Sequence, residues 1–83
     1  MNTSEFLEAP IKVEAKMSDG QLQPHSVVWQ GRQYTVITVG RQWAAQDGTH
    51  ILIEVHDGSR MEIQLGNDLN WRLLRYWPTT ASV

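Results

Sequence analysis

The glycines of this chain recur at short, nearly regular intervals, and this spacing constrains the fold more than any other feature. Six glycines follow one another at intervals of 8 to 11 residues. Three of them stand in the turn-forming sequences Ser18-Asp19-Gly20, Asp47-Gly48 and Asp57-Gly58. Glycine accepts a positive φ there, and aspartate hydrogen-bonds its own following backbone. Turns at this spacing leave room for short strands and predict an all-β sandwich or barrel.

Between the turns, apolar and polar residues alternate with the period of two that is typical of a strand. Ile11, Val13, Ala15 and Met17 share one face of a first strand, and similar alternation covers residues 51–55 and 61–65. No window shows helical spacing over three turns, although a short helical turn near residues 66–69 stays open. We therefore predict a small antiparallel meander of about six strands, curled into an SH3-like or partly open barrel.

Length and composition allow one domain. The chain has 83 residues, no cysteine and a net charge of -2, which is typical of a single small domain. We expect one β domain over residues 11–77, between a flexible N-terminal tail, 1–10, and a C-terminal tail, 78–83. The lack of cysteine excludes a disulfide scaffold, a thiolate zinc site and a cysteine nucleophile. No apolar run approaches the length of a membrane helix, and no secretory signal is recognisable, so we expect a cytoplasmic protein.

The turn sequences also predict the register of two hairpins. A two-residue loop at 31–32 would bring two aromatic residues opposite each other. A three-residue loop at 57–59 is preferred to a two-residue loop, which would place Arg60 on the apolar face. The opposed pairs predicted in this way are Trp29 with Tyr34, Val55 with Met61, and Glu54 with Glu62.

The segment that follows the second glycine is apolar on both faces of the expected strand. Tyr34 and Val36 would lie on one face, and Ile37 and Val39 on the other. A strand buried on both sides indicates a curled or closed sheet, or a partner chain that covers the outside. Gly40 then suggests a bulge or a bend.

Candidate catalytic and metal-binding residues are few. His50, Glu54 and His56 share a strand face, but residues four apart along a strand are about 13 Å apart and cannot share an ion directly. We prefer a solvated polar face. His25-Ser26 has no nucleophile-elbow pattern around it, and an exposed pair of Glu54 and Glu62 would lack the raised pKa that acid–base catalysis needs. We expect no enzymatic activity, no metal and no cofactor.

Three tryptophan-containing segments carry a resemblance to a known family. They are residues 29–36 (WQGRQYTV), Trp43 and residues 71–77 (WRLLRYW). Over about residues 10–77 the chain resembles a family of short, functionally uncharacterised bacterial domains, mainly of actinobacterial type, with W-x-G-R-x-Y-x-V and W-x-L-x-R-x-W motifs. The resemblance implies a compact β domain in a bacterial protein and no established activity.

The closing segment, residues 71–77, interleaves aromatic residues with arginines, a mixture that suits single-stranded nucleic acid but also an ordinary core strand. Charge does not favour nucleic acid, because residues 32–83 hold five arginines and five acidic residues. Aromatic residues and arginine also anchor protein interfaces, and an unclosed sheet leaves edges for strand addition or dimerisation. We predict a non-enzymatic protein-interaction or self-assembly module, with single-stranded nucleic-acid binding as the alternative. The candidate binding residues are Arg32, Arg41, Trp71, Arg72, Arg75, Tyr76 and Trp77.

Overall fold

The computed structural model describes residues 6–79, which form seven antiparallel strands and no helix. The strands belong to one sheet, in the order β1-β7-β6-β5-β4-β3-β2. The predicted all-β class is confirmed, and across this range no helix could span a membrane. The strands are β1 (Phe6–Pro10), β2 (Lys12–Ser18), β3 (Gln21–Trp29), β4 (Arg32–Ala45), β5 (Gly48–Val55), β6 (Arg60–Gly66) and β7 (Trp71–Trp77).

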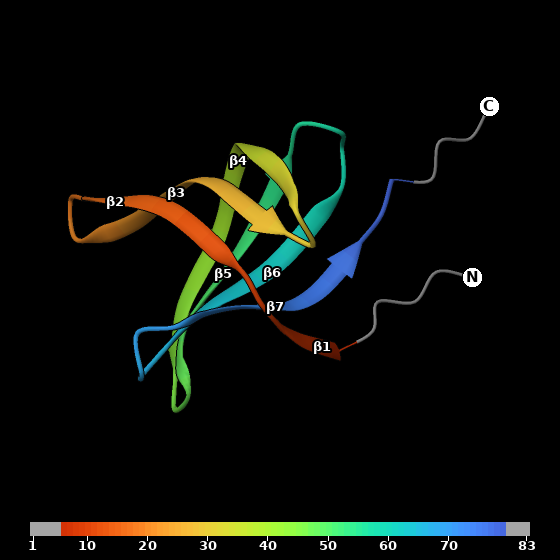
Figure 1. The fold of residues 1–83 in the computed structure, drawn as a ribbon. Helices are drawn as coiled ribbons and strands as arrows, with labels where there is room; N and C mark the ends of the chain where they lie inside the picture. Colours follow the sequence, from red (N-terminus) through yellow and green to blue (C-terminus); the bar gives the residue numbers. More distant parts are fainter. Residues whose placement is uncertain (1–5, 80–83) are drawn as a thin grey trace.

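The first two strands lie at opposite edges of the sheet, although only Ile11 separates them in the chain. The sheet therefore curls until its two edges approach each other, and the N-terminal segment passes from β7 to the β2–β3 hairpin (Figure 1). At the crossing, the Ile11 amide donates a hydrogen bond to the Trp71 carbonyl at 3.3 Å. The ladder of strand pairs stops there, so the sheet is curled but not closed, as the prediction of a partly open meander allows.

The structure differs from the sequence interpretation at the N-terminus. Phe6–Pro10, which we had expected in a flexible tail, forms β1 and pairs with β7, with Ala9 opposite Leu73. A five-residue segment ending in proline has no clear strand pattern, and its pairing depends on β7 being available. Residues 1–5 and 80–83 of the two predicted tails lie outside the described residues. Of the remaining C-terminal residues, Thr79 donates a side-chain hydrogen bond to the Asp57 carbonyl at 2.8 Å.

Strand β4 is long and bent, because it pairs first with β3 and then with β5. Its register against β5 shifts between Val36 and Thr38 and again between Val39 and Gln42, which confirms the bulge predicted near Gly40. An extra residue in one strand reverses the alternation of its side chains. Val36 and Val39 therefore both pack against the core, and Ile37 is 57% exposed. The prediction that β4 is buried on both faces was wrong for this reason.

The core lies inside the curl of the sheet. Apolar side chains from β3 to β7 meet there, and Trp29, Trp71 and Tyr76 cover the cluster while partly exposed. The alternation in residues 51–55 and 61–65 is confirmed, since Ile51, Ile53, Val55, Met61 and Ile63 all belong to the buried apolar cluster. The buried cluster consists of Val27, Tyr34, Ile51, Ile53, Val55, Met61, Ile63 and Leu73.

The β3–β4 turn begins one residue earlier than predicted. Its two loop residues are Gln30 and Gly31, with φ of 54° and 75°, and positive φ at both positions is what a two-residue type I′ turn requires. Trp29 therefore lies opposite Arg32 rather than Tyr34. The two aromatic rings still share a face as diagonal neighbours, with centroids 6.4 Å apart.

The β5–β6 turn also differs from the prediction. The Val55 amide donates to the Ser59 carbonyl at 2.9 Å, so the loop is residues 56–58, and Gly58 adopts a φ of 88°. Left-handed glycine at the third loop position is common in three-residue hairpins. The predicted pairing was wrong by two residues, which leaves every side chain on its predicted face but gives Glu62 a different opposite residue, Leu52 in place of Glu54.

Candidate functional site

The outer face of β4 to β7 is built from three rows of opposed residues, since residues directly opposite each other in antiparallel strands share a face. Each row runs from β4 or β5 to β7 and mixes charged, polar and aromatic side chains. The rows are Thr38, Glu54, Arg60 and Trp77; Leu52, Glu62 and Arg75; and Trp43, His50, Gln64 and Arg72.

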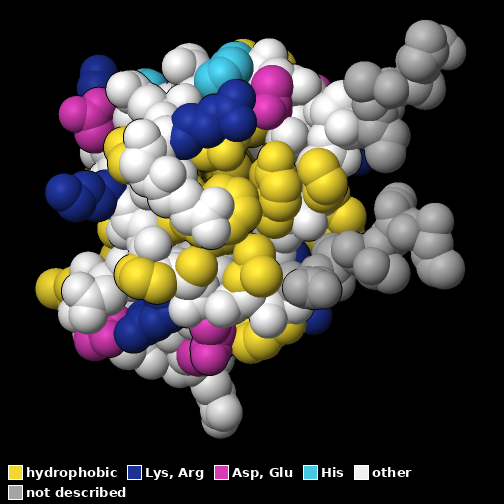
Figure 2. Space-filling view, turned by 45° about the vertical axis from the view of Figure 1, so that its right-hand side comes forward, with side chains coloured by type: hydrophobic (Ala, Val, Ile, Leu, Met, Phe, Trp, Pro, Cys, Tyr) yellow, Lys and Arg dark blue, Asp and Glu magenta, His cyan; other side chains and the backbone are white. Residues whose placement is uncertain are grey.

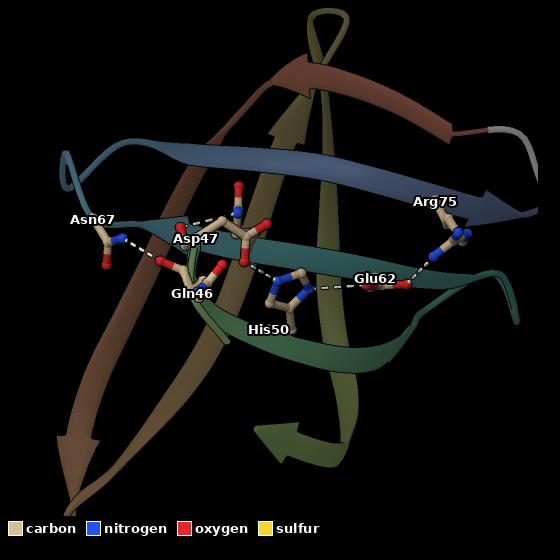
Figure 3. Close-up of polar contacts among 7 residues, drawn as sticks. Gln46, Asp47, His50, Glu62, Asn67 and Arg75 are labelled. Carbon is tan, nitrogen blue, oxygen red and sulfur yellow. Dashed lines mark hydrogen bonds and ion pairs between the residues drawn. The ribbon is translucent and has the colours of Figure 1, made fainter. Parts of the chain in front are cut away.

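A chain of four titratable side chains connects two of these rows (Figure 3). Asp47 Oδ1 lies 2.8 Å from His50 Nε2, and Glu62 Oε2 lies 3.0 Å from His50 Nδ1. Arg75 Nη1 donates to the other oxygen of Glu62, Oε1, at 3.0 Å. His50 is 8% exposed and Glu62 is 6% exposed. Both oxygens of a buried carboxylate and both nitrogens of a buried imidazole are therefore occupied.

The electrostatics of this chain favour a protonated histidine. Burial opposes the charge on the imidazole, but the hydrogen bonds and the negative charges of Asp47 and Glu62 outweigh it and raise the pKa of His50. The hydrogen bond from His50 in turn lowers the pKa of Asp47. An imidazolium donates from both nitrogens, as this geometry requires. The Trp43 ring stacks on His50 with centroids 5.2 Å apart.

The arrangement does not resemble a metal centre. Asp47 and Glu62 bind opposite nitrogens of the His50 ring, so their oxygens do not converge on one point. Among residues 6–79, no group of three or more histidine, cysteine or acidic side chains could hold an ion. His56, which was predicted to share a face with His50, lies in the β5–β6 loop and accepts a hydrogen bond from the Thr35 amide at 3.2 Å.

Glu62 corrects one of the sequence interpretations. The predicted register placed Glu62 opposite Glu54 on an exposed face, but Glu62 is buried and bonded to His50 and Arg75. Glu54 lies opposite Arg60 instead. The histidine–glutamate pair was missed because it joins diagonal neighbours, and a loop placed one residue too late moves every diagonal pair in the hairpin.

The two arginines of the closing segment are bonded to carboxylates. Arg72 donates to both oxygens of Asp68, at 2.7 and 3.2 Å, and this pairing, helped by Asn70, lowers the pKa of Asp68. Arg75 binds Glu62 and also lies over the Phe6 ring, 5.6 Å from its centroid. Their positive charge is therefore already balanced within the fold.

The four arginines among the candidate binding residues lie in different parts of the sheet. Arg32 follows the β3–β4 turn, Arg41 lies in the β4 bulge, and Arg72 and Arg75 lie on β7. Strands β5 and β6 separate β4 from β7, a distance of about 14 Å at ordinary strand spacing.

Tyr76 and Arg32 belong to an aromatic group at the end of β3 and β7. Trp29 meets Tyr76 edge to face with centroids 4.9 Å apart, and the Arg32 guanidinium lies 5.4 Å from the Tyr34 centroid. Figure 2 turns this end of the molecule toward the viewer and shows hydrophobic side chains gathered at its middle, with basic and histidine side chains above them. Because β3 and β7 are not neighbours in the sheet, these aromatic contacts hold together strands that no ladder joins.

The other predicted site residues have different places. Trp71 lies opposite Leu65 and packs against the core. Trp77 and Arg41 line a groove on the outer face, and Arg41 also lies 5.2 Å from the centroid of the Trp43 ring. The seven candidate binding residues are therefore distributed over the core, the outer face and the aromatic end.

A further exposed feature is the free edge of β2. Within residues 6–79 this strand pairs with β3 on one side only, and all its residues except Val13 are exposed. The β2–β3 hairpin extends away from the rest of the molecule (Figure 1), which measures 40 × 24 × 23 Å along its principal axes. Gln42 of β4 also contacts the hairpin, since its side-chain amide bonds both the amide and the carbonyl of Leu22, at 3.2 and 3.0 Å.

Comparisons with known proteins give no match: no family model matches this chain, and neither a curated protein nor a solved structure does. The resemblance based on the tryptophan motifs therefore stays a prediction.

Proposed function

We propose that this chain is a non-enzymatic self-assembly module that dimerises by pairing β2 of one copy with β2 of a second copy. The free edge of β2 is the observation that carries the proposal. Its seven residues form an unbulged strand with exposed side chains, because the register shift in this hairpin places the extra residue, His25, in β3. A regular, uncovered edge strand offers a row of backbone donors and acceptors to another chain.

The side chains of β2 favour one register of self-pairing. When two copies overlap over the whole strand in antiparallel orientation, Ala15 faces Ala15 and Glu14 faces Lys16 of the other copy, twice by symmetry. On the other face, Val13 meets Met17 of the second copy. Opposite charges and apolar residues placed directly opposite each other stabilise a strand pair. The register with the greatest overlap is therefore also one with complementary side chains.

The same residues discourage at least one shifted register. Sliding the two strands by two residues places Glu14 opposite Glu14 and Lys12 opposite Lys16, and like charges directly opposite each other are destabilising. Lysines on an edge strand commonly prevent unspecific pairing. In β2, they support a defined dimer over an open-ended assembly.

A charge exchange tests the register. Lys16→Glu and Glu14→Lys should each weaken the dimer by about tenfold or more, because each places like charges opposite each other at two symmetric positions. The double variant Glu14→Lys/Lys16→Glu should restore dimerisation. Sedimentation equilibrium over a concentration series gives the dimer dissociation constant for each protein.

Lys12→Glu is the matched control. It makes the same change of net charge as Lys16→Glu on the same strand. Lys12 faces Ser18 of the second copy in the proposed register, so the dimer should persist. A wild-type chain that stays monomeric at the highest soluble concentration, or a double variant no better than its parents, would contradict the proposal. Circular dichroism of all variants confirms that they fold.

Single-stranded nucleic-acid binding, the alternative function, receives less support. Arg72 and Arg75 would have to leave Asp68 and Glu62 before they could neutralise phosphates. Titration with an oligonucleotide at low salt should therefore leave the tryptophan fluorescence unchanged. Salt-dependent quenching would favour this function over self-assembly.

A further inference from the structure

A groove opens on the outer face of the sheet between the bend of β4 and the end of β7. Its volume is about 540 Å³, within the usual range for small-molecule sites. It lies over the central strands β5 and β6 and therefore does not involve the β2 edge. Among its lining residues are Gly40, Arg41, Leu52, Glu54, Arg60 and Trp77.

The groove exists because β4 places no side chain over Leu52. The second bulge of β4 brings Gly40 to this point, where a Cβ atom would lie 3.4 Å from the Leu52 carbonyl oxygen and 3.8 Å from its Cβ. Leu52 is left partly uncovered at the centre of a sheet. Trp77, at the end of β7, forms an apolar wall opposite the bulge. The floor and one wall therefore suit an apolar ligand body.

Two arginines give the rim of the groove a positive character. In the described part of the chain, the ion pairs of arginine involve Arg72 and Arg75, so Arg41 and Arg60 have no carboxylate at ion-pair distance. The buried Glu62 carboxylate is bonded to His50 and Arg75 instead. Arg41 lies over the Trp43 ring, a contact that leaves its planar N–H groups able to bind an anion.

One negative charge limits this character. Glu54 lines the groove and lies opposite Arg60 in the strand pair. Two guanidinium groups and one carboxylate leave a net charge of about +1 at the rim by ordinary side-chain ionisation. We propose that the groove binds a small amphiphilic monocarboxylate, with its apolar body over Leu52 against Trp77 and its carboxylate between Arg60 and Arg41.

Three probes with the same alkyl chain and different head groups test the proposal: decanoate, decanol and decyltrimethylammonium, each below its aggregation limit. Decanoate should bind about tenfold more tightly than decanol, and decyltrimethylammonium should bind most weakly, because charge-assisted hydrogen bonds distinguish the head groups. Isothermal titration calorimetry gives the affinities, and ¹⁵N chemical-shift changes locate the probe. Equal affinity for the three probes, or shifts outside the groove, would overturn the inference.

Variants separate the two halves of the site. Arg60→Gln and Arg41→Gln should each weaken decanoate by about tenfold and leave decanol unchanged, whereas Gly40→Val, which places a side chain over Leu52, should weaken both. Arg32→Gln removes an arginine that lies over an aromatic ring elsewhere on the molecule and should change neither. If Arg32→Gln reduces decanoate binding as much as Arg60→Gln, a general charge effect replaces the proposed site. Dimerisation is measured separately, so its failure would leave this test intact.

Discussion

The β5–β6 hairpin and the β2–β3 hairpin are both antiparallel pairs with alternating apolar and polar residues, but they differ sharply in burial. In β6, the five residues from Met61 to Leu65 are all buried or partly buried, whereas in β2 every residue except Val13 is exposed. Strand order accounts for the difference, since β5 and β6 are central and β2 is at an edge. The same local pattern therefore leads to a core in one place and to an available edge in the other.

The difference in burial also determines whether the polar side chains of each hairpin are hydrogen-bonded within the fold or exposed. In the central hairpin, His50, Glu62 and Gln64 are buried although they lie on the outer face, and a buried polar group must be hydrogen-bonded to be tolerated. Each of the three has such a partner, and the described residues contain no buried side-chain polar atom without one. In β2, the charged residues Lys12 and Lys16 remain exposed. They are free to meet another chain.

The largest expected effect contrasts one apolar truncation in each hairpin. Ile63→Ala removes a fully buried side chain and should reduce the free energy of unfolding by about 3 kcal/mol. Met17→Ala removes a side chain that is 68% exposed and should change it by less than about 0.5 kcal/mol. Urea unfolding at a single low protein concentration gives both values. Similar losses in the two variants would show that the Met17 side chain of β2 packs against the core after all.

A smaller loss is expected from the polar chain on the outer face. Glu62→Gln removes the charge that bonds His50 and Arg75 and should cost about 2 kcal/mol, as for a hydrogen bond to a charged group. Glu54→Gln is the matched change on the neighbouring strand and should have little effect, because Glu54 is only partly buried. Thermal unfolding of the two variants compares them. If the two variants unfold at the same temperature, this group of polar side chains is unimportant for stability.

The pH dependence of stability should reveal His50. Because its pKa is raised, the folded protein holds the imidazole proton more tightly than the unfolded chain does. In the unfolded chain, the pKa of histidine has its ordinary value of about 6.5. The resulting stabilisation is fully present below that pH and is lost as the pH rises through the folded-state pKa. Relative to His50→Gln, the wild-type protein should therefore lose stability as the pH rises above about 6.5. Urea unfolding at several pH values measures this difference, and parallel curves would contradict it.

The smallest effect is expected where the two regions are joined. Gln42→Ala removes the two hydrogen bonds to Leu22 and should cost about 1 kcal/mol. Amide hydrogen exchange should accelerate in residues 15–24, whereas the amides of β5 and β6 keep their protection. Acceleration spread evenly over the sheet would show that the hairpin does not open by itself.

Much of the fold follows from local patterns. The turn sequences at Asp47-Gly48 and Asp57-Gly58, together with the alternation around them, predict the strands β5 and β6, and the structure confirms both. The turn residues themselves were displaced by one position at two hairpins. Placing the β3–β4 turn one residue earlier has little energetic cost, because Gln30 can adopt the positive φ that a type I′ turn needs. Local chemistry therefore leaves the register open where several residues can occupy a turn.

The candidate sites were less accessible to prediction. Arg72 and Arg75 were recognised as charged residues of an aromatic segment, but their bonds to Asp68 and Glu62 depend on a turn and on a cross-strand neighbour. The groove depends on Gly40 lying over Leu52, which follows from the second β4 bulge. Such contacts join residues that are distant in sequence, and alternation carries no information about them.

By itself, the sequence determined that this protein is an antiparallel all-β chain with an apolar face built from alternating residues, because turn propensity and side-chain period act over a few neighbouring residues. Tertiary structure alone decided that Phe6–Pro10 joins the sheet, that Glu62 is buried against His50, and that β2 lies at an edge of the sheet. These features depend on which strands become neighbours. Which strands become neighbours depends on the burial of the whole sheet around one core, and it cannot be read from any single local segment.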